Sequence, residues 1–365
     1  MLLATAAMLA FSAGCPAAPA SVAPAIAPLR DLVTPLDIRF DAFTLRNGLR
    51  VVVHTDRRTP IVAVGVWYDV GSTSEPAGKS GFAHLFEHLM FNGTENAPGD
   101  FFAPLKQMGA TDYNGTTDFD RTNYYETVPT DALERTLYLE SDRMGWLLGA
   151  VTPHVLNVQR GVVQNEKRQR DSQPYGLVSY RQTAALHPPG HPYAHDPIGS
   201  MKDLDEATLG DVRAWFRDHY GPNNAVLVLS GDIGAASARP LVEKYFGGIA
   251  RGPDARVTIP PVVPLPKPVN ETMTDRVATV LIDRSWPVPG LNSPDSPALD
   301  IAAGVLGNLA SSRLAETLVR REKLAVSATA GNVSRSHAGM FDIRIMVRPG
   351  VDPAVVTARL DAIMA

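Results

Sequence analysis

The chain has 365 residues, of which 45% are hydrophobic and 20% are charged, and its formal net charge is −4 at pH 7. This length is sufficient for two domains with hydrophobic cores, and the composition is typical of a soluble globular enzyme. The near-neutral charge, without a basic stripe, argues against nucleic acid as a partner, and the sequence holds no glycine-rich phosphate loop.

The first segment is typical of a secretory signal. Residues 1–13 are apolar, and an Ala- and Pro-rich stretch runs to about residue 28, so we interpret residues 1–28 as a signal peptide and linker. Cys15 is the only cysteine, which excludes an internal disulfide. The residues before it resemble a bacterial lipoprotein cleavage site, and both a lipid anchor at Cys15 and ordinary cleavage fit this pattern. We expect an exported protein, periplasmic or associated with the outer membrane of a Gram-negative bacterium.

The following segments predict strands and a helix. The dipeptide Asn47-Gly48 lies between alternating apolar residues, which predicts a tight hairpin. Residues 61–70 have the composition of a buried strand that Gly71 would end. A helix is expected next, and Gly93 would supply its stop.

The strongest chemical signal lies in that helix. The sequence His84-Leu85-Phe86-Glu87-His88 reads H-x-x-E-H, the inverse of a zinc-peptidase motif. Positions i and i+4 share one face of a helix, so His84 and His88 can hold one metal ion between them. Glu87 lies beside that face, where a carboxylate can take a proton from a metal-bound water. The alternative is that the two histidines are ordinary core residues.

A catalytic zinc needs a third protein ligand and keeps a fourth position open. The segment 157–169 reads as a helix, and it carries Glu166, which follows His88 by 78 residues. Glu166 lies one turn beyond two valines that have helical spacing. Taken alone, it would be a solvated helix charge.

With these motifs together, the chain from about Phe43 onward resembles the insulinase/pitrilysin family, the inverzincins. The family pattern V-V-x-N-E-K/R-R is matched by residues 162–168. Further family landmarks match at residues 174–176, 191–193 and 220–232. The resemblance implies Zn²⁺ bound by His84, His88 and Glu166, with Glu87 as the general base.

The resemblance also implies a substrate site. Residues 109–117 resemble the family strand that lies beside the metal and pairs with the substrate backbone, and Asn114 matches the family asparagine there. Gly115 stands where alanine is common. Many family members carry a second glutamate seven residues before the third ligand, where this chain has Gln159. We expect Gln159 to orient a neighbour by hydrogen bonding without adding charge.

The implied fold is α+β, with two homologous domains that each have a mostly antiparallel sheet and helices packed on one face. We place the zinc-binding domain at 38–252, a semi-rigid proline-rich linker at 253–268 and an incomplete second domain at 269–365. The expected elements of the second domain are strands at 276–286, 326–333 and 341–347, and helices at 295–306, from 311 onward and at 352–364.

The second domain departs from the family pattern. Family members grip substrate with an arginine and a tyrosine after the second-domain helix; here Arg320 or Arg321 would supply the arginine, and Val326 occupies the place of the tyrosine. We therefore expect the chain to continue into a second half or to pair with a homologous subunit. Alone it should be a weak peptidase.

Other polar groups have plainer interpretations. His187, His191 and His195 recur every four residues, but the prolines between the first two prevent a shared helical face. We interpret them as surface loop histidines, with a loop metal site as the alternative. Asp118 and Asp120 are predicted to alternate on a strand and face solvent.

The sequence therefore predicts a zinc metalloendopeptidase that hydrolyses peptides or unfolded polypeptides with a zinc-activated water. The alternative is a non-catalytic family member that acts as a binding or scaffold subunit. Such members usually lose Glu87 or a histidine, and this chain keeps all of these residues. A purely structural zinc site would need a closing fourth ligand, and no cysteine is available for it.

Overall fold

The computed structural model describes residues 37–254, 259–260 and 264–365. The predicted signal segment and Cys15 lie outside these residues. By its internal contacts the chain divides into Met1–Ile38 and Arg39–Ala365, and the architecture below is that of the second unit. In the part of the chain that the structure describes, no helix has both the length and the apolar character needed to cross a membrane.

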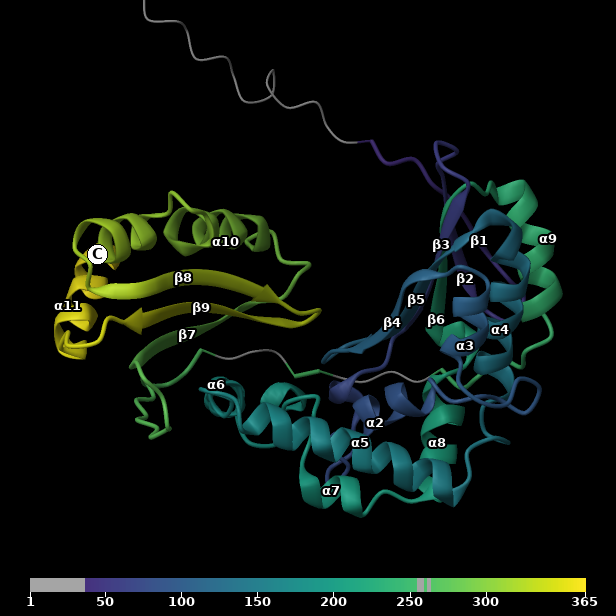
Figure 1. The fold of residues 1–365 in the computed structure, drawn as a ribbon, viewed down its shortest axis with the longest axis horizontal. Helices are drawn as coiled ribbons and strands as arrows, with labels where there is room; N and C mark the ends of the chain where they lie inside the picture. The colour runs from purple at the N-terminus through teal and green to yellow at the C-terminus, as the bar shows by residue number, and fades with distance from the viewer. Residues whose placement is uncertain (1–36, 255–258, 261–263) are drawn as a thin grey trace, which may run out of the picture. The chain divides into compact units, whose positions relative to one another are not determined.

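A six-stranded sheet organises the first part of this unit, in the order β1-β2-β6-β3-β5-β4 (Figure 1). Its strands are β1 (Asp41–Thr44), β2 (Arg50–Thr55), β3 (Ile61–Tyr68), β4 (Thr111–Thr117), β5 (Thr122–Pro129) and β6 (Ala225–Gly231). Only β2 and β6 pair in parallel; every other neighbouring pair is antiparallel. The predicted hairpin joins β1 to β2, and Gly48 there has a φ of 95°, which glycine adopts without steric cost.

Helices cover one face of this sheet. Along β3, Val62, Val64 and Val66 are buried whereas Ala63 and Trp67 are exposed, as expected for a strand with one covered face. Helices α4 and α9 pack against the strands (Figure 1). The helices of this part are α2 (Phe82–Leu89), α3 (Phe102–Gln107), α4 (Leu133–Trp146), α5 (Pro153–Asp171), α6 (Val178–Leu186), α7 (Met201–Asp205), α8 (Leu209–His219) and α9 (Ala235–Phe246).

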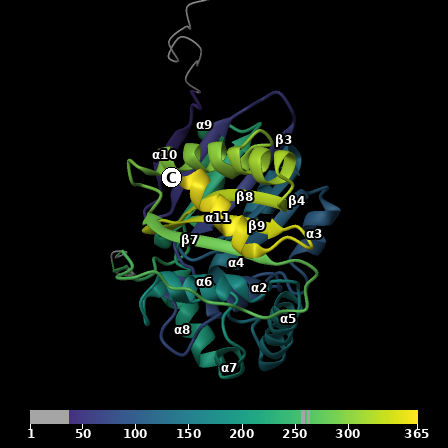
Figure 2. The same ribbon diagram turned by 90° about the vertical axis from the view of Figure 1, so that its left-hand side faces the viewer.

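A three-stranded antiparallel sheet, in the order β7-β9-β8, organises the last part of the chain (Figure 2). Its elements are β7 (Leu281–Pro289), β8 (Ala325–Ser334), β9 (Ala338–Val347), α10 (Ser296–Ala303) and α11 (Pro353–Met364), with π-helical turns at Gly304–Asn308 and Ala315–Arg321. Alternate residues of β9 enter a core that is separate from that of the six-stranded sheet. The α+β expectation, with mostly antiparallel sheets, is confirmed.

Several local predictions differ from the structure. The strand expected at 276–286 begins at Leu281 and continues to Pro289, and the helix expected from 311 onward is mostly π-helical. Gly93 does not end the metal helix. The helix ends at Leu89, and Gly93 lies beyond it, where a Cβ atom would be 2.4 Å from the backbone nitrogen of Gly99.

The histidine and aspartate predictions also need correction. His187 and His191 are buried, with exposed fractions of 4% and 5%, and their rings stack at 4.9 Å, so they are not surface loop histidines. Asp118 is exposed as expected, but both aspartates lie in the turn after β4. Asp120 accepts a hydrogen bond of 2.6 Å from the Tyr193 hydroxyl group and is only partly solvated.

Candidate metal centre

Helix α2 carries the H-x-x-E-H sequence and presents its two histidines on one side. Leu85, Phe86 and Leu89 are fully buried and anchor the rest of the helix in the core. The ring centroids of His84 and His88 lie 4.8 Å apart. Among the described residues, the group that could hold a metal ion is His84, Glu87 and His88, whose ligand atoms all lie within 4.8 Å of one another.

Helix α5 packs against α2 and brings Glu166 to the same place. Its Oε2 atom lies 3.7 Å from Nε2 of His84 and 3.4 Å from Nε2 of His88. Ligands at about 2.0–2.1 Å from a tetrahedral zinc ion are roughly 3.3 Å apart, so these separations match what one ion would require. The donor set of two imidazoles and a carboxylate therefore fits zinc and leaves a fourth position open.

The protonation states of the two histidines suit coordination. Burial lowers the pKa of His84 to about 3, and the interactions with the neighbouring His88 ring and with the charge of Arg170 act in the same direction. Burial also lowers the pKa of His88, against the opposing charge of Glu166. Both rings are therefore held neutral near pH 7, which is the form that binds a metal ion.

Glu87 differs from an ordinary surface carboxylate, because only 6% of it is exposed. Burial raises its pKa to about 7, and the negative charge of Glu166 adds to that shift. A hydrogen bond with Thr117 and the charge of Arg121 act in the opposite direction. A carboxylate with a pKa close to neutral can both accept and release a proton.

The N-terminus of α2 is held by a side chain that precedes the helix in the sequence. The N-cap residue, Gly81, has a φ of 92° and offers no capping side chain. Glu75 takes its place: its carboxylate accepts hydrogen bonds from the backbone N–H groups of Gly81, at 3.1 Å, and Ala83, at 2.8 Å. The ring of His195 lies 2.8 Å from the same carboxylate. A buried anion at the N-terminus of the helix also interacts favourably with the helix dipole.

We expect Glu75→Ala to lower the free energy of unfolding by roughly 2–4 kcal/mol, because it leaves buried N–H groups unpaired and removes a charged partner of His195. Glu75→Gln, which keeps one acceptor, should cost less. Urea unfolding of both variants measures these changes. Equal stability of Glu75→Ala and the parent would show that the cap does not support α2.

At the other end of α2, Asn92 caps the helix. Its side-chain amide donates to the carbonyl groups of His88, at 3.1 Å, and Leu89, at 3.2 Å. The side chain of Gln159 in turn donates to Oδ1 of Asn92 at 3.3 Å. Gln159 thus supports the C-terminal end of the metal helix through Asn92.

The strand proposed to hold substrate, β4, lies at the edge of the six-stranded sheet and pairs only with β5. Asn114 is exposed on it, and Gly115 is buried. A Cβ atom at Gly115 would lie 2.8 Å from Cζ of Phe91 and 2.9 Å from Cδ1 of Tyr124, which explains glycine in place of alanine. The free edge of β4 can accept one more extended strand.

The second-domain residues considered for substrate binding either pair with another side chain or lack a polar group. Arg320 and Arg321 both lie near Glu316, at 2.6 Å and 3.8 Å. Val326 is 54% exposed on β8, and its side chain cannot donate a hydrogen bond.

Comparison with known proteins agrees with this geometry. Residues 50–186 match the family model described as Insulinase (Peptidase family M16), and residues 206–365 match the one described as Peptidase M16 inactive domain. The zinc protease PqqE of Helicobacter pylori is 32% identical over 312 residues, which are 83% of this chain and 69% of that protein. The chain belongs to the M16, or insulinase, peptidase family.

Two further M16 comparisons bear on fold and assembly. The crystal structure of a protease from Helicobacter pylori has a TM-score of 0.79 and 29% identity, and the match covers 89% of this chain and 79% of that one. The human cytochrome b-c1 complex subunit 1 is 27% identical over 268 residues, which are 72% of this chain and 54% of that protein. M16 relatives thus include a protein named a zinc protease and a protein named a complex subunit.

The boundary of the second M16 model does not coincide with a structural boundary. That model begins at residue 206, but β6, which follows it, lies between β2 and β3 in the first sheet. The two core clusters separate instead between Ile249 and Ala303. The domain limits expected from the sequence remain a proposal.

Sequence reasoning did not identify the residues that hold α2. The contacts that support Glu75 and Asn92 come from distant segments, from His195 and Gln159 respectively. The capping contacts of Asn92 itself are local, because the carbonyl groups that it binds belong to residues three and four positions before it.

Proposed function

We propose that this protein is a zinc-dependent endopeptidase that hydrolyses peptides or unfolded polypeptides. The observation that supports this most directly is the convergence of His84, His88 and Glu166 beside the buried carboxyl group of Glu87. A catalytic zinc site has this arrangement: three protein ligands, an open fourth position and a proton acceptor beside it.

Each group of the site has a separate role in the proposed hydrolysis. A zinc ion held by His84, His88 and Glu166 would polarise a water molecule and the scissile carbonyl group. Glu87 accepts the proton of the attacking water and delivers it to the leaving amine. The free edge of β4 binds the peptide in an extended form by main-chain hydrogen bonds, with Asn114 and Gly115 beside it.

The metal assignment predicts specific losses of affinity. His84→Ala and Glu166→Gln should each weaken zinc binding at least about tenfold, since even losses in the surrounding hydrogen-bond shell cost that much. Competition with a chromophoric chelator measures the affinity. His154→Ala is a matched control, because His154 lies outside the metal group. Unchanged affinity in both ligand variants would contradict the assignment.

A second candidate function is that of a non-catalytic subunit. The match of residues 206–365 to the model described as inactive, and the relative named as a complex subunit, favour it. The test is peptide hydrolysis by the zinc-loaded protein, alone and with its homologous partner or second half, with and without chelator. Hydrolysis that the chelator stops supports the peptidase; zinc binding without hydrolysis in any combination supports the subunit.

We also propose that the protein is exported, because its first residues are apolar and small. N-terminal sequencing of the protein from fractionated cells tests this. We expect a mature chain that begins near Cys15 and is found in the cell envelope. Its intact mass distinguishes a lipid on Cys15 from ordinary cleavage. Protein that retains Met1 in the cytoplasm would contradict export.

A further inference from the structure

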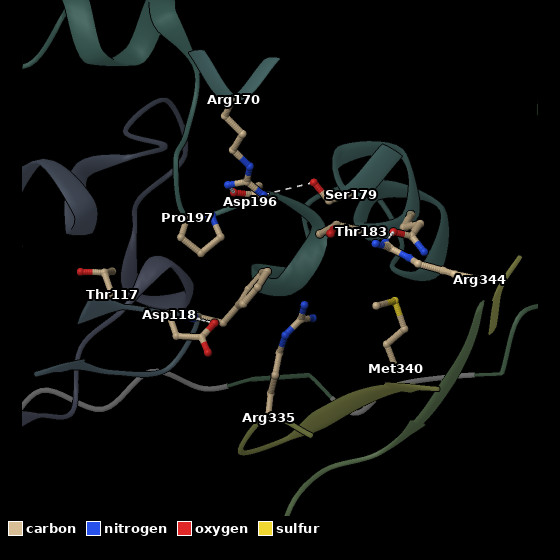
Figure 3. Close-up of a pocket in the computed structure, with 12 residues that line it drawn as sticks. Thr117, Asp118, Arg170, Ser179, Thr183, Asp196, Pro197, Arg335, Met340 and Arg344 are labelled. Carbon is tan, nitrogen blue, oxygen red and sulfur yellow. Dashed lines mark hydrogen bonds and ion pairs between the residues drawn. The ribbon is translucent and has the colours of Figure 1, made fainter. Parts of the chain in front are cut away.

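A cavity of about 300 Å³ is lined by residues that lie far apart in the sequence (Figure 3). The end of β4 contributes Thr117, the chain after it contributes Phe119, and the β8–β9 turn contributes Arg335. Helices α5 and α6 complete its walls with Arg170 and Ser179, among others. In Figure 3 the side chain of Arg335 points from the β8–β9 turn into this space.

The cavity is connected to the catalytic groups by two of its residues. Thr117 lines the cavity, and its side chain acts on Glu87 by lowering the pKa of that carboxyl group. Arg170 lies one turn after Glu166 on α5, and its positive charge contributes to the lowered pKa of His84. A peptide that pairs with the edge of β4 and continues past Thr117 would therefore reach the cavity from the site of hydrolysis.

Two of the three cavity arginines already have partners. Arg170 forms two hydrogen bonds with the carboxylate of Asp196, at 2.9 Å and 2.8 Å. Arg344 lies 2.8 Å from a carboxylate oxygen of Asp283 and 3.4 Å from one of Asp342. These two cations are largely neutralised within the protein.

Arg335 is the exception. Its guanidinium group makes no hydrogen bond or ion pair with the residues that the structure describes, and it stacks over the ring of Phe119 at 3.5 Å from the centroid. Partial burial lowers its pKa, and the carboxylates of Asp118 and Asp120 interact with it only at longer range. A partly buried guanidinium group whose five donors make no hydrogen bond with the described residues can donate to a ligand, and its fork matches a carboxylate.

We propose that Arg335 binds a carboxylate of the peptide substrate in this cavity. The inference rests on the proposed peptidase function and adds to it a preference for acidic peptides. The carboxylate has two sources, the side chain of an Asp or Glu near the cleaved bond or the free C-terminus of the peptide. Phe119, Pro197 and Met340 provide apolar walls that would strengthen the charged contact by excluding water.

The simpler alternative is that Arg335 only anchors the β8–β9 turn through its stack on Phe119. That role predicts an effect on stability, or an equal effect on all peptides. A substrate-binding role predicts discrimination between peptides of the same length that differ only in one carboxylate.

The experiment measures peptide binding without turnover, so that it does not depend on catalysis. Fluorescence anisotropy would follow labelled, otherwise uncharged peptides bound to zinc-loaded Glu87→Gln, with the zinc-free parent as a second non-cleaving form. One series carries a single glutamate or glutamine at successive positions, and a second has a free or amidated C-terminus. The variants are Arg335→Met, Arg335→Lys and the control Arg313→Met, which removes an exposed arginine that does not line the cavity.

We expect the carboxylate peptide to bind roughly tenfold or more tightly than its neutral counterpart, the usual scale for a charge-assisted hydrogen-bond pair. Arg335→Met should abolish this preference, Arg335→Lys should retain part of it, and Arg313→Met should leave it unchanged. The series in which the preference appears identifies the source of the carboxylate.

Equal binding of charged and neutral peptides by folded protein would overturn the proposal, as would a preference that survives Arg335→Met. If Arg335→Met does not fold, the result for Arg335→Lys decides. Failure of hydrolysis by the zinc-loaded parent, both alone and with its homologous partner or second half, with the binding preference intact, would overturn the peptidase function and leave Arg335 as a carboxylate-binding residue.

Discussion

Glu87→Gln is expected to reduce kcat for peptide hydrolysis by roughly a hundredfold or more, the usual scale for loss of a general base. Glutamine keeps the shape of the side chain but cannot accept a proton near neutral pH. Zinc should remain bound, because the proposed ligands are His84, His88 and Glu166. Steady-state kinetics on an unstructured peptide, with zinc content measured on the same sample, tests both expectations.

The matched control is Glu95→Gln, which removes a carboxylate outside the metal group. It should leave kcat unchanged. If Glu87→Gln retained full turnover at full zinc occupancy, another group would have to be the base. If it lost zinc as well, the loss of activity would no longer report on proton transfer.

The candidate metal centre can be predicted from the sequence because the residues that define its motif are close together in the chain. His84, Glu87 and His88 lie within five residues of one helix, and helical geometry alone places both histidines on one face. Glu166 was found through the motif around it, within a helix that extends from Pro153 to Asp171. The edge strand with Asn114 follows from the same resemblance, and its place at the end of the sheet gives that expectation a physical basis.

The supports of the site were not predictable from spacing. Glu75 and His195 are 120 residues apart, and no periodicity relates them. Gln159 was expected to orient a neighbour, but the sequence does not reveal that this neighbour is Asn92. Such contacts depend on how α2 and α5 pack, which single-sequence patterns do not specify.

The sequence also does not predict that His187 and His191 are buried, because their burial depends on contacts between distant segments. Prolines near His187 and His191 indicate an irregular segment, and irregular segments usually lie at the surface. Here the two rings stack and pack near Tyr193, which is fully buried. The position of Arg335 opposite Phe119 likewise requires the β8–β9 turn and the end of β4 to meet, which no local pattern indicates.

A buried charge cluster joins α4 to β5, the strand that pairs with β4. Arg143 has an exposed fraction of 1% and forms an ion pair with Glu140, three residues earlier on α4. Its guanidinium group lies between two rings, 3.9 Å from the centroid of Phe101 and 4.2 Å from that of Tyr124. Burial raises the pKa of Glu126 well above its usual value; the charge of Glu140 adds to the shift and that of Arg143 opposes it.

Arg143→Met should lower the free energy of unfolding by roughly 3–5 kcal/mol, because it leaves the carboxylate of Glu140 buried without a cation. Loss of the Arg143 charge also removes the cation that opposes the raised pKa of Glu126, so this pKa should rise further in the variant. The folded state then binds more protons than the unfolded state, so stability falls as the pH rises through the unfolded pKa of Glu126. The destabilisation relative to the parent should therefore be larger at neutral pH than at mildly acidic pH.

Urea unfolding at both pH values measures this destabilisation. The double variant Arg143→Met with Glu140→Met should recover part of the loss. A loss that is small and independent of pH would show that Arg143 acts through packing on Phe101 and Tyr124 rather than through its charge.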